Sequence, residues 1–356
     1  MKIGIYDPYL DDLGGGEKYM MTIATCLSKD HEVNVFWNDK KDLDELVERF
    51  SIDLSRIKLV PNVFTKDHSF LTRAFETRKY DCLIVLSDGG IPLSFAKKTY
   101  LHIQQPLKME SRFIITKFKT TKINAIFFNS EFTKRMVRDK LNIPKAVIYP
   151  PIKLLPKKTK KENIILHVGR FRVKNVESIE DYKKQSLMIP VFKEMIDEGL
   201  SDWRFVLAVS IKPSDREQFE KLKESAKNYP IDFMINKNND SLWEVYNKAK
   251  IYWHASGFGE DLEKHPEFAE HFGISTVEAM GAGAVPVVIN AGGQTEIVED
   301  GVSGFLWDTI KEFKEKTLKL TKDEDILAKM SENAKARARY FSEKNFCQKI
   351  KELIES

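Results

Sequence analysis

The sequence is poor in cysteine, with only three among its 356 residues. Cys26, Cys82 and Cys347 are odd in number, lie far apart and share no metal-binding motif. This pattern argues against a disulfide framework and against a zinc site. We therefore expect a reducing environment, which favours a cytoplasmic location.

Long hydrophobic runs and a strong charge of one sign are also missing. No uninterrupted apolar run reaches the roughly 18 residues of a spanning helix, and the chain opens on strand-like Lys2–Tyr6 rather than on a secretory signal. The net charge of +4 is too small to predict a nucleic-acid partner but permits weak attraction to phosphate or anionic lipid. The composition, 42% hydrophobic and 31% charged, is typical of a folded globular protein, and the length predicts two domains.

Short apolar runs alternate with amphipathic segments through the first half of the chain. Such alternation predicts an α/β fold with a parallel, doubly wound sheet. The expected strands are Lys2–Tyr6, Glu32–Trp37, Ile57–Val60, Asp81–Leu86, Thr99–Ile103, Ala125–Asn129 and Ala146–Tyr149. The expected helices are Gly15–Ser28, Asp42–Phe50, Phe70–Arg78 and Glu131–Leu141.

Pro150, Pro151 and the lysine-rich stretch Lys157–Lys161 interrupt this pattern and predict an interdomain hinge. The alternation then restarts, so we expect a second Rossmann-like unit. Its expected strands are Asn163–Val168, Arg204–Val209, Ile231–Met234, Lys250–His254 and a short one from Val285, with helices at Lys183–Glu198, near Ser214–Asn228 and after Gly273. A charged helical tail is expected from about Asp323, with a break near Phe341.

Two carboxylates, Glu270 and Glu278, stand eight positions apart across a loop-to-helix junction. The junction itself is Gly273-Ile274-Ser275, and a helix start with free N–H groups suits a diphosphate. A carboxylate one turn inside that helix can bind a ribose diol. The carboxylate before the helix, Glu270, then faces the group that is attached to the diphosphate. The block predicts a site for an activated sugar.

Cations lie where such a site would need them. Arg170 follows a predicted strand, and ligands of doubly wound sheets bind beyond the carboxyl ends of strands. Lys183 or Lys184 would lie near the start of the next helix, where it could help neutralise a diphosphate as charge develops. The residues alone do not decide between the two lysines, and ordinary exposed cations would look the same.

Three features of the first half each have a functional and a purely structural interpretation. Gly14–Gly16 precede a helix and could approach a phosphate, although a glycine run is as often only a flexible loop. His102 ends a strand just before a proline-marked loop and could face a cleft, although a histidine satisfied within the packing is normally the favoured interpretation. The segment Ser111–Ala125 mixes apolar residues with lysines and is either a membrane-surface segment or a core helix.

An acidic, histidine-rich loop in the second half is conceivable as a metal site. Its members are His254, Glu260, Asp261, Glu263, His265, Glu267 and His271. The spacing H-E-x-x-H is missing, so we interpret the loop as solvated surface and expect no metal ligands.

Taken together, the motifs give the chain a resemblance to the family 4 retaining glycosyltransferases of the GT-B fold. Within that family it resembles the branch that contains the dolichol-pathway α-1,2-mannosyltransferase and its prokaryotic relatives. The matching pieces, in the family's order, are GGGEKYM from Gly14, NSEFTKRM from Asn129 with YPPI from Tyr149, HVGRF from His167, KKQSLMIPVF from Lys183, and Glu270-x7-Glu278 with Gly292-Gly293.

The resemblance implies two Rossmann-like domains that face a central cleft. Residues 1–150 would bind the acceptor, residues 151–340 would bind the nucleotide sugar, and a helix at 341–356 would cross back onto the first domain. Closure about the proline hinge would then assemble the site.

The resemblance also implies roles for single residues. Arg170 and Lys183 would grip the donor diphosphate, and Lys183 is chosen because the apolar residues after it then match the family's helix. Glu270 would lie near the hydroxyls of the transferred sugar, and Glu278 would hold the ribose. In the first domain, Gly15 and Gly16 would approach the phosphate, and His102 would lie near the reacting sugar. The stretch Val173–Tyr182 is longer than in many members, and Gln104-Gln105-Pro106 differs from the mannosyltransferase pattern.

The implied activity is transfer of a hexose from a nucleotide diphosphosugar with retention of configuration, in a reaction that needs no divalent metal. GDP-mannose is the favoured donor, with UDP-glucose or UDP-N-acetylglucosamine as alternatives. The acceptor would be a glycan, either soluble or polyprenyl-linked, with possible peripheral contact to the inner membrane face. Competing hypotheses are an epimerase or phosphorylase of the same fold, and a non-catalytic module that binds a sugar nucleotide or a glycan.

Overall fold

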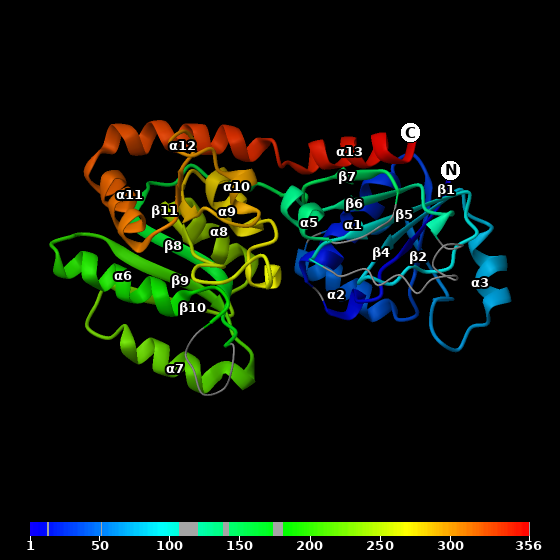
Figure 1. Ribbon diagram of the computed structural model, residues 1–356, viewed down its shortest axis with the longest axis horizontal. Helices are drawn as coiled ribbons and strands as arrows, with labels where there is room; N and C mark the ends of the chain where they lie inside the picture. The colour runs from blue at the N-terminus through cyan, green and yellow to red at the C-terminus, as the bar shows by residue number, and fades with distance from the viewer. Residues whose placement is uncertain (13, 51, 107–119, 138–141, 174–180, 356) are drawn as a thin grey trace. The chain divides into compact units, whose positions relative to one another are not determined.

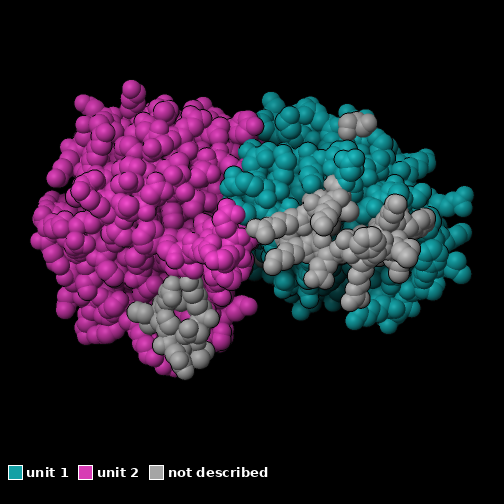
Figure 2. Space-filling model, in the orientation of Figure 1, with its two compact units in different colours: residues 1–151, 343–356 teal, residues 152–342 magenta. Residues whose placement is uncertain are grey.

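The computed structural model describes the chain except for residues 13, 51, 107–119, 138–141, 174–180 and 356. It divides into two compact units, coloured separately in Figure 2. Unit 1 consists of Met1–Pro151 with Glu343–Ser356, and unit 2 consists of Ile152–Ser342. Each unit contains one parallel sheet with helices packed on it (Figure 1).

The sheet of unit 1 has seven parallel strands in the order β3-β2-β1-β4-β5-β6-β7. Its central strands are buried on both faces, which explains why they are near-continuous apolar runs in the sequence. The order reverses between β1 and β4, as in a doubly wound sheet. The strands are β1 (Lys2–Tyr6), β2 (Glu32–Phe36), β3 (Ile57–Val60), β4 (Cys82–Leu86), β5 (Lys98–Ile103), β6 (Ala125–Phe128) and β7 (Lys145–Val147).

The helices of unit 1 begin where the sequence offers polar caps or glycine. Ser69 caps α3 by accepting from the Thr72 N–H, and Ser130 caps α5 by accepting from the Thr133 N–H. The helices are α1 (Gly15–Leu27), α2 (Lys40–Phe50), α3 (Phe70–Thr77), α5 (Glu131–Met136) and α13 (Glu343–Glu355). The helix predicted to run to Leu141 ends earlier, because Val137 has extended backbone and caps α5, and residues 138–141 lie outside the described part of the chain.

The last helix, α13, belongs to unit 1 although it follows the whole of unit 2 in sequence. Its residues Phe346, Ile350 and Ile354 recur every four positions and are buried in the core of unit 1. The ring of Phe346 meets the Tyr19 ring of α1 edge-on, with centroids 4.9 Å apart. The prediction that the final helix returns to the first domain is confirmed.

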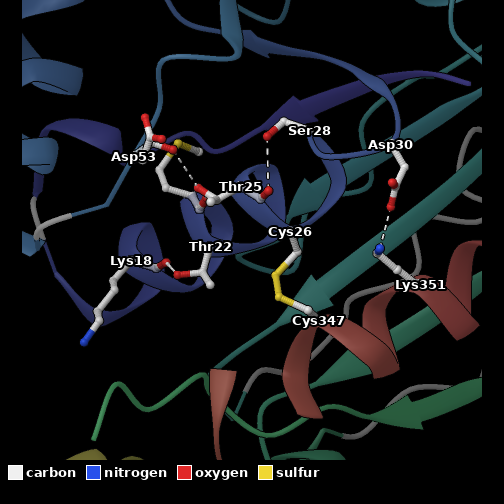
Figure 3. The surroundings of a disulfide bond; sticks show 10 residues. Lys18, Thr22, Thr25, Cys26, Ser28, Asp30, Asp53, Cys347 and Lys351 are labelled. Atoms are coloured by element: carbon white, nitrogen blue, oxygen red, sulfur yellow. Dashed lines mark hydrogen bonds and ion pairs between the residues drawn. A yellow bond between two sulfur atoms is a disulfide. The ribbon is translucent and has the colours of Figure 1, made fainter. Parts of the chain in front are cut away.

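The expectation for the cysteines was wrong. Cys26 of α1 and Cys347 of α13 form a disulfide across a sequence separation of 321, with Cα atoms 5.3 Å apart (Figure 3). The number and spacing of the cysteines in the sequence could not show this pair, because the two residues meet only when α13 returns to unit 1. Beside them, Lys351 of α13 forms an ion pair of 2.5 Å with Asp30. Cys82 is free and buried, and burial raises the pKa of its thiol to about 12.

The sheet of unit 2 has six parallel strands in the order β10-β9-β8-β11-β12-β13. The order reverses between β8 and β11, which places the switch point of this sheet at the ends of those two strands. The fold class predicted from the alternation is therefore confirmed. The strands are β8 (Glu162–Arg170), β9 (Arg204–Ser210), β10 (Ile231–Ile235), β11 (Ala249–His254), β12 (Val285–Ile289) and β13 (Phe305–Trp307).

The helices of unit 2 cover this sheet, with a core rich in aromatic rings around Trp253. They are α6 (Gln185–Asp197), α7 (Arg216–Ser225), α8 (Asn239–Lys248), α9 (Ile274–Gly281), α10 (Gln294–Ile297), α11 (Ile310–Lys322) and α12 (Glu324–Arg339). The predicted helical tail is thus α12 followed by α13, with the break at Tyr340–Ser342. In the described part of the chain, no helix has the length and apolarity to cross a bilayer.

Candidate functional site

The switch point of unit 2 gathers the side chains that the sequence singled out. Arg170 ends β8 and is exposed, while His254 ends the neighbouring strand β11 and is buried. Lys183 lies just before α6, and Glu270 lies in the loop before α9. Because parallel strands point their carboxyl ends to one edge, these loops meet there.

Glu270 is the centre of this group. Its Oε2 accepts hydrogen bonds from Lys183 Nζ at 2.6 Å and from His254 Nε2 at 2.9 Å. Burial acts to raise the pKa of Glu270, but the Lys183 ammonium and the His254 ring together hold it well below its usual value. Burial also lowers the pKa of His254, against the opposing effect of Glu270. The result is an ionised carboxylate fixed by two donors.

A second histidine, His167, connects the strand ends and the helix that carry these side chains. His167 is fully buried on β8, where its Nδ1 donates to the Trp253 carbonyl at 2.9 Å. Its Nε2 then accepts from Gln185 Nε2 at 3.2 Å, and the same amide lies 3.4 Å from the Arg170 carbonyl. Burial lowers the pKa of His167 to about 3, so the ring is neutral. This chain of contacts ties the start of α6 to the end of β8.

The two glycines after β12 explain how Glu270 is held in place. Gly293 N–H donates to the Glu270 carbonyl at 2.8 Å. Gly292 has a φ of +61°, and a Cβ there would collide with that same carbonyl oxygen. A Cβ on Gly293 would collide with the backbone of Phe272. Only glycine permits this close approach, so the pair sets the backbone position of Glu270.

The start of α9 is open to an anion. Its N-cap Gly273 has a φ of +118°, and no described side chain caps the helix. The first N–H groups of a helix have no partner within the helix, and they attract negative charge. Next to them, the Ser275 hydroxyl lies 2.8 Å from Tyr252 OH, which fixes its direction.

The start of α6 is already occupied by a carboxylate. Asp181 is buried, and its two oxygens accept from the Gln185 N–H at 3.0 Å and the Ser186 N–H at 2.9 Å. Of the two helix starts at this edge, α9 is therefore the one that suits a phosphate.

Glu278 lies one turn inside α9, on the same helix as the open start. Its Oε2 accepts from Tyr246 OH of α8 at 3.1 Å. The side chain is partly exposed, so its remaining acceptor capacity can reach a ligand hydroxyl.

The structure separates the two adjacent lysines that the residues alone could not separate. Lys183 pairs with Glu270, as described above. Lys184 is buried, has left-handed backbone with φ 59°, and forms an ion pair of 2.5 Å with Glu260. Lys183 is thus the lysine of the group around Glu270.

The predicted residues of the first half lie together within unit 1. Gly15 and Gly16 open α1, where Glu17 accepts from the Gly14 N–H at 2.5 Å. His102 is completely buried on β5, and its ring stacks on Tyr19 with centroids 4.0 Å apart. His102 Nδ1 donates to the Phe127 carbonyl at 3.2 Å, while Nε2 has no hydrogen-bond partner among the described residues.

The remaining expectations concern loops. In the acidic loop, Lys264 pairs with Asp261 at 2.7 Å and His265 with Glu267 at 3.1 Å. Over the described residues, no group of three or more His, Cys, Asp or Glu is arranged to hold a metal ion. Most of Ser111–Ala125, and residues 174–180 of the long stretch before Lys183, lie outside the described residues.

Sequence reasoning missed three contributors. Tyr246 and Tyr252 were not singled out, because buried aromatic residues are common and no spacing marks them. His254 was considered only as a metal ligand, although it ends the predicted strand Lys250–His254. The rule that ligands gather at carboxyl ends of parallel strands, already applied to Arg170, was the signal that could have found it.

A family model described as "Glycosyl transferases group 1" matches residues 155–337, which is more than half of the chain and lies within unit 2. Among curated proteins, the GDP-Man:Man(3)GlcNAc(2)-PP-Dol alpha-1,2-mannosyltransferase of Dictyostelium discoideum is 25% identical over 247 residues, which cover 64% of this chain and 46% of that protein. The alpha-1,3/1,6-mannosyltransferase ALG2 of the same organism is 27% identical over 288 residues, 76% of this chain and 60% of its own length. The chain therefore matches only about half of the length of these relatives.

Solved structures share the fold over the full chain. Anabaena HepE in complex with UDP superposes with a TM-score of 0.71 at 19% identity and covers 100% of both chains. The sucrose-phosphate synthase of Thermosynechococcus elongatus superposes with a TM-score of 0.69 at 13% identity and covers 99% of this chain and 98% of its own. At these identities the likeness shows the fold alone.

Proposed function

The chain belongs to the group 1 family of glycosyl transferases, family 4 of the retaining enzymes with the GT-B fold, and from this premise we propose that it transfers a hexose from a nucleotide diphosphosugar to a glycan hydroxyl. The observation that carries the proposal is the group of Glu270, Lys183 and His254 beside the open start of α9. All of these residues lie inside the segment that matches the family.

The donor diphosphate would bind at the start of α9. The N–H groups of Ile274 and Ser275 supply backbone donors, while Lys183 and the exposed Arg170 supply positive charge. These groups stabilise the departing nucleoside diphosphate, on which charge develops as the glycosidic bond breaks. Gly273 allows the backbone to approach the phosphates closely.

The two glutamates would divide the rest of the donor. Glu278, one turn inside α9 and oriented by Tyr246, accepts from the ribose hydroxyls. Glu270 is ionised and accepts from hydroxyls of the transferred sugar, with Lys183 and His254 fixing the position of its carboxylate.

We propose the same-face route to retention, in which the acceptor attacks from the face that the diphosphate leaves. The departing phosphate oxygen takes the acceptor's proton, so no side-chain nucleophile is needed. The rate then depends mainly on how well the protein stabilises the departing phosphate. On unit 1, Gly15 and Gly16 are proposed to approach the phosphate. His102 Nε2 is proposed to accept a hydrogen bond near the reacting sugar, since burial lowers the pKa of this ring to about 3 and its Nδ1 already donates.

GDP-mannose is the donor we favour, because both Dictyostelium relatives are named as mannosyltransferases and one of them as GDP-mannose dependent. UDP-glucose is the main alternative, since HepE was solved with UDP-glucose, and UDP-N-acetylglucosamine follows. The acceptor is proposed to be a glycan or a lipid-linked glycan, as the name of the first relative indicates for that protein.

The test is release of GDP or UDP from a panel of donors, with and without a lipid-linked glycan acceptor. We expect acceptor-dependent release of GDP from GDP-mannose. Glu278→Ala should chiefly raise the KM for donor and Arg170→Ala should chiefly lower kcat, while the exposed control Glu267→Ala should change neither. Binding without turnover of any donor would instead favour a non-catalytic module, and unchanged kinetics in both variants would reject the assigned site.

A further inference from the structure

The loop between β12 and α10 contacts the start of α9 as well as the segment that carries Glu270. The helices α9 and α10 lie side by side in unit 2 (Figure 1). Gly292 and Gly293 approach the backbone of residues 270–272, as described above. The next residue, Gln294, is the first of α10, and its side chain packs against Gly273, the N-cap of α9.

The Gln294 side chain occupies the space that a side chain on Gly273 would need. A Cβ on Gly273 would lie 2.7 Å from Gln294 Nε2 and 3.1 Å from Ile297 Cδ1. Gly273 also has a φ of +118°, which residues with a side chain rarely adopt. The backbone at the start of α9 thus lies directly against the Gln294 carboxamide, and the direction of its N–H groups depends on this contact.

The Gln294 carboxamide is fully buried, and it is unpaired among the described residues. Its exposed fraction is 0%, and neither Oε1 nor Nε2 has a hydrogen-bond partner there. A buried amide without partners destabilises a protein, whereas a methionine of the same length would fill the same space without that cost. Packing alone therefore does not explain a glutamine at this position, and its place beside the start of α9 indicates a role in ligand binding.

We propose that Gln294 is a positioning residue for the nucleoside diphosphate, and that its carboxamide becomes hydrogen-bonded when the diphosphate binds at the start of α9. The inference rests on the proposed function, which assigns the diphosphate to that helix start. Glycine rotates its peptide groups at low cost, so binding to the first N–H groups of α9 can bring the Gly273 peptide within reach of the amide. The hydrogen bonds of Gln294 then form in the complex alone and contribute to its affinity.

The test compares Gln294→Met with Gln218→Met, which changes a second buried glutamine of unit 2, on α7 and 5% exposed. Calorimetric titration with GDP and with UDP measures binding, and thermal unfolding without nucleotide measures stability. Gln294→Met should weaken nucleotide binding about tenfold, equivalent to about 1.4 kcal/mol. Its Tm without nucleotide should be unchanged or higher, because the unpaired amide is gone. Gln218→Met should leave the affinity unchanged.

The combination of weaker binding with undiminished stability separates positioning from packing. With a donor that is turned over, the loss for Gln294→Met should appear in KM rather than in kcat. Unchanged affinity in Gln294→Met would overturn the proposal. A lower Tm together with weaker binding would assign Gln294 a packing role and would also overturn it.

Failure of the proposed function gives a different result. If the unmodified chain bound neither GDP nor UDP, the assignment of the α9 start to a nucleoside diphosphate would be rejected, and this inference with it. If the unmodified chain bound one of them and Gln294→Met bound it equally well, only the role of Gln294 would be rejected.

Discussion

Replacement of Lys183 by Met tests the centre of the site, and the adjacent Lys184→Met serves as its matched control. Both lysines pair with a carboxylate in the structure, Lys183 with Glu270 at 2.6 Å and Lys184 with Glu260 at 2.5 Å. The two variants remove the same side chain one position apart, so they separate a role in ligand binding from a role in folding.

The loss of stability expected for Lys183→Met follows from the burial of the ion pair between Lys183 and Glu270. Removing one partner of a buried ion pair costs about 3–5 kcal/mol, and since the side chains of Lys183 and Glu270 are still 22% and 20% exposed, we expect about 2–3 kcal/mol. In the unmodified chain the pKa of Glu270 is depressed, so its contribution to stability is present above its ordinary pKa of 4.5 and is lost as pH falls through the folded value. Without Lys183 that pKa rises, so protonation relieves the cost at acid pH. The loss should therefore be largest near neutral pH and should shrink toward acid pH.

Urea unfolding followed by tryptophan fluorescence at neutral and acid pH measures this difference, and calorimetric titration with GDP measures binding. Lys183→Met should weaken GDP binding by roughly 10- to 150-fold, the equivalent of one charge-assisted hydrogen bond of about 1.5–3 kcal/mol. Lys184→Met should destabilise the protein and leave GDP affinity nearly unchanged. Equal binding losses in both variants would refute the assignment of Lys183, and a stability loss that does not vary with pH would refute the ion pair.

Two further predictions concern the scaffold of each unit. Cys347→Ser removes the disulfide between α1 and α13 and should destabilise the chain by about 2–5 kcal/mol, seen as a lower Tm. In the unmodified protein no thiol should react with a thiol reagent until reduction, because Cys82 is buried with a pKa of about 12, and a fast-reacting thiol would contradict the disulfide. Lys161→Met removes the ammonium that donates to the Ala249 carbonyl at 2.8 Å and the Ala282 carbonyl at 2.7 Å, at the ends of α8 and α9. We expect the free energy of unfolding to fall by about 2–4 kcal/mol and the KM for donor to rise, because α9 carries Glu278. A stability loss with unchanged KM would show that Lys161 does not position Glu278.

The strands and the edge where they end could be predicted from the sequence for a physical reason. Strands of parallel sheets are buried on both faces, so β4 and β12 are short, continuous apolar runs with clear ends. Once the alternation gives the topology, the rule for carboxyl ends places Arg170 and Glu270 at one edge. Three helices of unit 2 were not predicted, α8, α10 and α11, nor was the short strand β13. Helices α8 and α11 are rich in polar residues, and their buried faces are set by neighbours far away in sequence.

The details that decide the chemistry depended on contacts that no local pattern contains. Lys183 and Lys184 are equivalent in sequence, and the left-handed backbone of Lys184 turns the two side chains to different carboxylates. Cys26 and Cys347 are neighbours only because the last helix returns to unit 1. His254 acquires its partner from a loop sixteen residues further along the chain.

The sequence marked the starts of α1 and α9 as possible phosphate sites, and the start of α6 lies beside Lys183; these three helix starts are not equivalent. The start of α6 is closed, because the buried carboxylate of Asp181 already accepts from its first N–H groups. At the start of α1, Glu17 accepts from the Gly14 N–H and places a negative charge close to any phosphate that approaches Gly15 and Gly16. Among these three, only α9 starts without a carboxylate cap from the described side chains, and its N-cap is Gly273. The diphosphate should therefore be held by the backbone of α9, and α6 should contribute through the side chain of Lys183 rather than through its dipole.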